Sequence, residues 1–145
     1  SGLDLPDTVR GIIADCGYTS PHDICRKVLA QTNSHLPIGP IYTVGRLGTL
    51  VFGRFDPEDA DCRQAVAKTN IPILFIHGEA DDFVPCDMSR ENYEACAGRK
   101  KLVTIPGAGH AVAYYVDIPA YEKAVTDFLA DCLQDSPEVA QTNQQ

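Results

Sequence analysis

Two residues of this chain have the types and positions needed for acid–base catalysis. Asp81 follows the apolar run 72–77, and His110 follows the apolar run 101–105 and a turn that contains two glycines. A carboxylate can accept a hydrogen bond from an imidazole, fix its tautomer and stabilise the cation that forms when the imidazole takes a proton. An acid and then a base, each placed after a strand-like run, therefore predict a catalytic pair.

The segments that must position this pair are predicted to form a parallel sheet. The run 72–77 is apolar without alternation, which is typical of a parallel strand covered on both faces, and the loops at the carboxyl ends of such strands carry the chemistry. We predict an α/β fold with a three-stranded, mainly parallel sheet flanked by helices. The expected strands are 9–16, 71–77 and 101–105, and the expected helices are 21–33, 55–70, 89–97 and 117–133.

The segment 36–55 departs from this alternation of strands and helices. It is apolar but is interrupted repeatedly by glycine and proline, so it is too short and too broken for a membrane span. Two interpretations remain open. One is a lid over an apolar substrate pocket, and the other is a surface helix pair packed on the sheet.

Composition excludes several classes of partner. The formal net charge is −8, so no excess of basic side chains exists to neutralise nucleic-acid phosphates or an anionic membrane surface. We therefore expect no nucleic-acid partner and no membrane partner. The six cysteines lack C-x-x-C spacing, which predicts reduced thiols and a cytoplasmic protein.

Other chemistries have weaker support in the sequence. No H-E-x-x-H motif and no glycine-rich phosphate loop is present, so we predict neither a metal nor a cofactor. His77 ends an apolar strand and is expected to cap its turn, while Asp82 lies one residue out of register with the predicted acid. Cys16 is expected to be a small buried hydrophobe, although Cys16 and Cys86 remain alternative nucleophiles.

The residues around the predicted pair resemble the carboxyl-terminal half of the α/β-hydrolase family. The resemblance is carried by two motifs, G-x-x-D-x-x-V at Gly78, Asp81 and Val84, and G-x-G-H at Gly107, Gly109 and His110. In that family a nucleophile in a G-x-S-x-G elbow comes first, then the acid, then the histidine. The resemblance implies that Asp81 is the orienting acid and His110 the general base. No G-x-S-x-G occurs in the 145 residues, so the nucleophile is expected upstream.

The resemblance also predicts the organisation of the chain. Residues 1–133 would be the carboxyl-terminal portion of an α/β-hydrolase domain, with 21–60 as a cap or lid connection and 134–145 as a disordered tail. The strand at 9–16 would lose its upstream neighbour, which predicts a homodimer through this edge or association with the missing amino-terminal half.

The function that follows is the acid/base half of a serine hydrolase. Its partner would be a small-molecule acyl substrate, a carboxylic ester or a related compound, and the chain alone would be inactive without the upstream serine. The alternative is a catalytically silent α/β domain used for binding or assembly.

Overall fold

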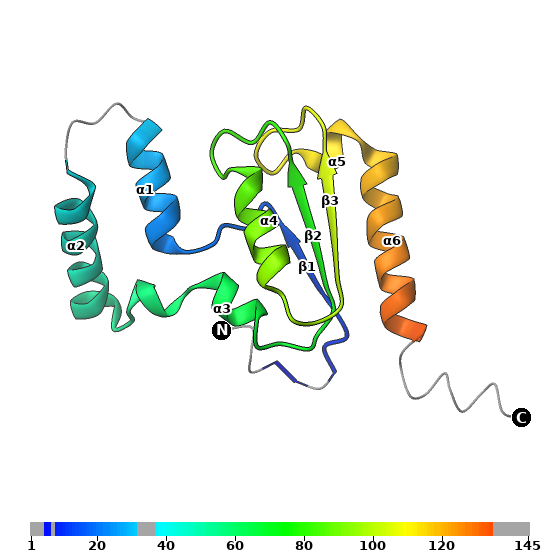
Figure 1. Ribbon diagram of the computed structural model, residues 1–145, viewed down its shortest axis with the longest axis horizontal. Helices are drawn as coiled ribbons and strands as arrows, with labels where there is room; N and C mark the ends of the chain where they lie inside the picture. Colours follow the sequence, from blue (N-terminus) through cyan, green and yellow to red (C-terminus); the bar gives the residue numbers. More distant parts are fainter. Residues whose placement is uncertain (1–4, 7, 32–36, 135–145) are drawn as a thin grey trace, which may run out of the picture.

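A computed structural model describes residues 5–6, 8–31 and 37–134 of the chain. Three parallel strands form one sheet in the order β1 (Ile12–Asp15), β2 (Ile73–Gly78) and β3 (Lys100–Ile105) (Figure 1). The predicted α/β fold with a three-stranded parallel sheet flanked by helices is therefore confirmed. β1 and β3 form the two edges of this sheet, and association through the β1 edge stays a prediction.

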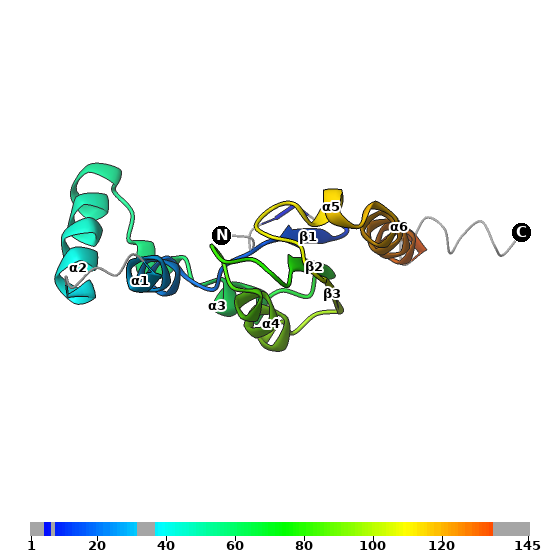
Figure 2. The same ribbon diagram turned by 90° about the horizontal axis from the view of Figure 1, so that it is seen from above.

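The central strand β2 explains why the sequence shows a continuous apolar run. Every residue from Ile73 to Gly78 is buried, because helices cover both faces of the sheet. On one face, Leu74 and Ile76 pack with Phe128 of helix α6 (Ile118–Gln134). On the other face, Ile73 and Phe75 form a cluster closed by residues of and next to α3 (Cys62–Val66) and α4 (Cys86–Ala95). Figures 1 and 2 show α6 and α4 on opposite sides of the strands.

The register brings the carboxyl ends of the strands to one edge of the sheet. Ile76 pairs with Asp15 of β1, and Gly78 pairs with Ile105 of β3. The loops that follow β2 and β3 therefore start side by side, as a parallel sheet requires.

Two helices form a lobe beside the sheet. Helix α1 (Pro21–Gln31) begins after Ser20, whose Oγ accepts a hydrogen bond from the backbone N–H of Asp23 at 3.1 Å. Helix α2 (Ile38–Gly48) continues without a break into the π-helical turn η1 (Thr49–Gly53). Figures 1 and 2 show that α1 and α2 lie next to each other and away from the faces of the sheet.

Several predicted segments differ in detail. The segment 36–55 was expected to break repeatedly at its glycines, but in the described part it is helical from Ile38 to Gly53, because packing against α1 offsets the propensity cost of about 1 kcal/mol for each glycine. The predicted helix 55–70 is two short pieces, the 3-10 turn η2 (Pro57–Asp59) and α3. The short helix α5 (Ala113–Val116) was not predicted.

The helix predicted at 89–97 begins three residues earlier than expected, at Cys86. The predicted disordered tail, 134–145, lies outside the described residues except for Gln134, which ends α6. Among the helices of the described ranges, none has the length and apolar character required to span a bilayer.

Candidate active site

The loops after β2 and β3 are joined directly by their backbones. The N–H of Glu79 donates to the carbonyl of Ile105 at 3.0 Å, and the N–H of Ala80 donates to the carbonyl of Ala108 at 2.9 Å. A Cβ atom at Gly78 would lie only 2.3 Å from the Ala108 oxygen, so this close approach requires glycine. The contact places the acid-bearing loop against the histidine-bearing loop.

Asp81 and His110, the two residues predicted to be catalytic, meet at this junction. His110 Nδ1 lies 2.8 Å from Asp81 Oδ2, and because a carboxylate only accepts, Nδ1 carries the proton of this hydrogen bond. The Asp81 side chain is fully buried, whereas that of His110 is 37% exposed. A buried acid that holds a partly exposed imidazole is the arrangement expected of an orienting acid and a general base.

The carboxylate of Asp81 is held from several directions. Its Oδ1 accepts hydrogen bonds from the backbone N–H groups of Val84 at 2.8 Å and Phe83 at 3.0 Å, while its Oδ2 faces His110. Burial alone would raise the pKa of Asp81, but the hydrogen bonds from His110 and Val84 oppose it, and the pKa is lowered from its ordinary value of 3.8. The acid is therefore ionised near neutral pH.

A second histidine, His77, whose sequence position predicts a turn cap, contacts the same carboxylate. His77 Nε2 lies 3.1 Å from Asp81 Oδ2 and 2.8 Å from the carbonyl oxygen of Val84, and its Nδ1 lies 2.6 Å from Ser89 Oγ. The side chain of His77 is fully buried. The signal in the sequence was a lone histidine at the end of an apolar strand, four residues before the predicted acid.

Cys16 also lies at this junction, in an unusual backbone conformation. It follows β1 with φ of +53°, and its Sγ accepts a hydrogen bond at 3.3 Å from the N–H of Ala111, which itself has φ of +56°. Burial raises the pKa of the Cys16 thiol to about 11, and Asp15 adds to this rise. A protonated thiol is a weak nucleophile, so the burial of this side chain disfavours the alternative that Cys16 attacks a substrate. Burial likewise raises the pKa of Cys86.

Cys16, Asp81 and His110 each offer a ligand atom, and these atoms lie within 4.8 Å of one another. Such a triplet has the spacing of a metal site. However, both oxygens of Asp81 already accept N–H groups, and the Cys16 thiol keeps its proton at neutral pH. The donor set therefore fits hydrogen bonding better than metal binding, and the expectation that no metal is bound stays a prediction.

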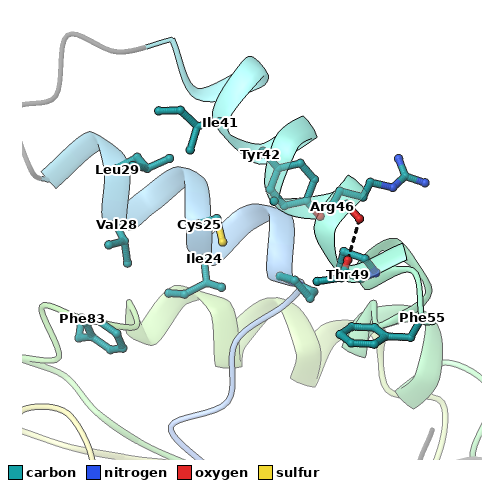
Figure 3. A pocket seen from close by; sticks show the side chains of 13 residues that line it. Ile24, Cys25, Val28, Leu29, Ile41, Tyr42, Arg46, Thr49, Phe55 and Phe83 are labelled. Atoms are coloured by element: carbon teal, nitrogen blue, oxygen red, sulfur yellow. Dashed lines mark hydrogen bonds between the residues drawn. The ribbon is translucent and has the colours of Figure 1, made fainter. Parts of the chain in front are cut away.

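An apolar cavity of about 740 Å³ lies between α1, α2 and the loop after β2 that carries Phe83 (Figure 3). The charged side chain in its wall, Arg46, is neutralised by Asp56, with Nε and Oδ1 2.8 Å apart. The ring of Phe83, which forms part of the cavity wall, lies 5.1 Å from that of His110, so the cavity extends to a residue next to the base. The remaining wall residues are mostly apolar: Pro21, Ile24, Cys25, Val28, Leu29, Ile41, Tyr42, Gly45, Thr49, Phe55 and Pro57.

Comparison with known proteins gives a family match. The model of a family described as serine hydrolase (FSH1) matches residues 9–113, a range that holds Asp81 and His110. The uncharacterized protein YqkD of Bacillus subtilis (strain 168) is 27% identical over 139 residues, which are 95% of this chain. The chain spans only 45% of the length of YqkD.

Two further proteins are similar over different shares of the chain. The bifunctional esterase/perhydrolase DCH of Acinetobacter calcoaceticus is 31% identical over 55 residues, 38% of this chain and 20% of that protein. The crystal structure of an alpha/beta fold family hydrolase from Bacillus anthracis superposes with a TM-score of 0.58 at 14% identity, covering 88% of this chain and 61% of the other. The superposition on the Bacillus anthracis hydrolase supports the same fold for this chain.

Proposed function

Because this chain belongs to the serine hydrolase (FSH1) family, we propose that Asp81 and His110 are the acid and the base of a triad that cleaves carboxylic esters or related acyl substrates. The resemblance to the α/β-hydrolases is confirmed by the family match and by the shared fold. The observation that carries the proposal is the 2.8 Å hydrogen bond between His110 Nδ1 and Asp81 Oδ2. It leaves Nε2 as the ring nitrogen that accepts a proton.

The proposed reaction begins at a serine that lies outside these 145 residues, in a G-x-S-x-G turn. His110 Nε2 takes the hydroxyl proton as the serine oxygen attacks the acyl carbon, and the Asp81 carboxylate stabilises the resulting imidazolium. The imidazolium then gives its proton to the departing alcohol, which leaves an acyl-enzyme. A water molecule, deprotonated by the same nitrogen, hydrolyses that ester and restores the serine.

The lobe of α1 and α2 is proposed to be a cap over the acyl group of the substrate. In support, the cavity beneath this lobe is apolar, reaches the ring next to His110, and falls within the roughly 300–1,000 Å³ that small-molecule sites occupy. Ile24 and Val28 project from α1 toward the side of the lobe on which Phe83 lies (Figure 3). DCH, which matches part of the chain, is named as an esterase, and this favours ester substrates.

The full-length protein tests the catalytic assignment. We expect turnover of p-nitrophenyl esters and labelling of one serine by a fluorophosphonate, and we expect His110→Ala to lower kcat by a thousandfold or more, roughly the loss seen for triad members. The isolated 145 residues should give no labelling. A full-length protein that neither turns over esters nor reacts with the probe would favour the catalytically silent binding domain instead.

A bulky substitution tests the cap. Val28→Trp would fill the cavity, so it should lower kcat/KM for decanoyl esters well below that for acetyl esters, because each methylene excluded from an apolar site costs about 0.8 kcal/mol. Val44→Trp is the matched control, since Val44 lies on α2, is 72% exposed and is not part of the cavity wall. Equal chain-length profiles for the two variants would place the acyl group elsewhere.

A further inference from the structure

We infer that His77 is a positioning residue that holds the Asp81 carboxylate in the orientation required by His110. The inference rests on the proposed function, in which Asp81 orients the base. It does not concern a group that touches the substrate, because the His77 side chain is fully buried and Asp81 stands between it and His110.

The hydrogen-bond partners of His77 place a proton on its Nε2. The carbonyl oxygen of Val84, 2.8 Å from Nε2, can only accept, so Nε2 carries a proton. The same N–H faces Asp81 Oδ2 at 3.1 Å, and it therefore ties the carboxylate and the Val84 carbonyl to the end of β2. One donor thus holds both the acid and the loop that carries it.

Ser89 sets the rotation of the imidazole from the other side. Its Oγ lies 2.6 Å from His77 Nδ1 and 3.4 Å from the carbonyl oxygen of Gly17, in the segment that follows β1. Ser89 Oγ therefore meets the ring at Nδ1, on the other side from the Nε2–H that faces Asp81. Ser89 is itself buried in α4, and the chain of contacts therefore runs from a packed helix through His77 to the acid.

Oδ2 of Asp81 is shared between two imidazoles with different surroundings. His77 approaches it from the protein interior and His110 from the partly exposed side. The backbone N–H groups of Phe83 and Val84 bond only Oδ1 of Asp81. These two bonds alone would let the carboxylate rotate and change the position of Oδ2. The His77 N–H removes this freedom, because it fixes where Oδ2 points. A misplacement of about 1 Å in such a group can cost on the order of a hundredfold in rate.

Two substitutions of His77 in the full-length protein separate positioning from packing. Gln carries its N–H donor at about the reach of Nε2, whereas Asn carries its donor at about the reach of Nδ1. We expect His77→Asn to lower kcat for p-nitrophenyl butyrate roughly tenfold to a hundredfold, with KM within twofold of the unsubstituted protein. His77→Gln should restore most of that loss. Equal kcat for the two variants, or a loss confined to KM, would overturn the inference.

A second pair of variants has a matched control on the same helix. Ser89 and Asn92 are both buried in α4, and both bond backbone carbonyls in the segment that follows β1. Asn92 differs because its Nδ2 donates to the carbonyl of Tyr18 at 3.0 Å, and it is hydrogen-bonded to neither His77 nor Asp81. Ser89→Ala should therefore lower kcat severalfold more than Asn92→Ala at a similar loss of melting temperature. If the two variants lose the same activity, Ser89 and His77 act only through stability.

An NMR measurement tests the inference apart from turnover. The His110 Nδ1 proton bonded to Asp81 should appear far downfield, and ring ¹⁵N shifts should report the Nε2–H tautomer at His77. The downfield proton should persist in His77→Gln and disappear or move upfield in His77→Asn. An unchanged proton in His77→Asn would refute positioning even if the protein hydrolyses esters. Conversely, absence of hydrolysis with the expected proton shifts would refute the proposed function and leave the positioning intact.

Discussion

Replacing the acid and replacing the base should affect activity alike but stability differently. Asp81 accepts N–H groups at both oxygens in a fully buried position, whereas the His110 ring is partly exposed and reaches solvent. We compare Asp81→Asn with His110→Ala in the full-length protein. Both should lower kcat by a thousandfold or more, because Asn favours the wrong imidazole tautomer and Ala removes the base.

The stability difference follows from the donors around Oδ2. The Asn oxygen must face the N–H groups of Phe83 and Val84, which places its NH₂ group against the N–H groups of both imidazoles. His110 can turn toward solvent, but His77 is fixed by Val84 and Ser89 and cannot. Losing a buried hydrogen bond to a charged acceptor costs about 1.5–3 kcal/mol, so the loss of the two imidazole bonds in Asp81→Asn should lower the free energy of unfolding by about 3–6 kcal/mol.

His110→Ala should lower the free energy of unfolding by only about 1 kcal/mol. It removes an edge contact with Phe83 and the hydrogen bond to Asp81 Oδ2, but water that enters the gap can donate to Oδ2 in place of the imidazole. Urea unfolding followed by circular dichroism, with a common slope for all variants, measures both values. Two results would refute this account of the buried acid. One is an Asp81→Asn protein as stable as the unsubstituted one, and the other is a His110→Ala protein less stable than Asp81→Asn.

Three further predictions follow from individual contacts. Gly78→Ala should destabilise the protein by several kcal/mol, because its Cβ would lie 2.3 Å from a carbonyl oxygen, while Gly48→Ala, at an open helical position, should stabilise it by up to about 1 kcal/mol in the same urea assay. The folded-state pKa of Asp81 is depressed, so its stabilising contribution is present above about pH 4 and is lost as pH falls through the folded pKa. The difference in the free energy of unfolding between the unsubstituted protein and Asp81→Asn should therefore become smaller in that acidic range. Iodoacetamide at pH 8, followed by mass spectrometry, should modify exposed Cys25 and spare Cys16, whose pKa is about 11; equal modification would contradict the burial of Cys16.

The sequence was sufficient for the strands and for the predicted pair. A run such as 72–77 has no polar alternation, so only a strand covered on both faces accommodates it, and parallel strands end at a common edge. The proximity of Asp81 and His110 follows from that topology alone, although their catalytic roles stay a proposal. The length and continuity of α2 did not follow, because glycine lowers local helix propensity, while the packing that offsets it comes from another helix, α1.

Some contacts that hold the site join segments distant in the sequence, and the sequence alone did not reveal these. His77 looked like a turn cap, because its partner Ser89 lies on a helix whose position depends on how α4 packs against the sheet. Likewise, nothing in the types of Cys16 and Ala111 requires a positive φ, yet both adopt one where the thiol of the first meets the N–H of the second. Such conformations cost on the order of 1–3 kcal/mol each and persist where the surrounding structure enforces them. One of these residues comes directly after His110 and the other directly after β1. We therefore infer that this strain, at a cost in stability, fixes the loop that carries the base, just as His77 fixes the carboxylate of the acid.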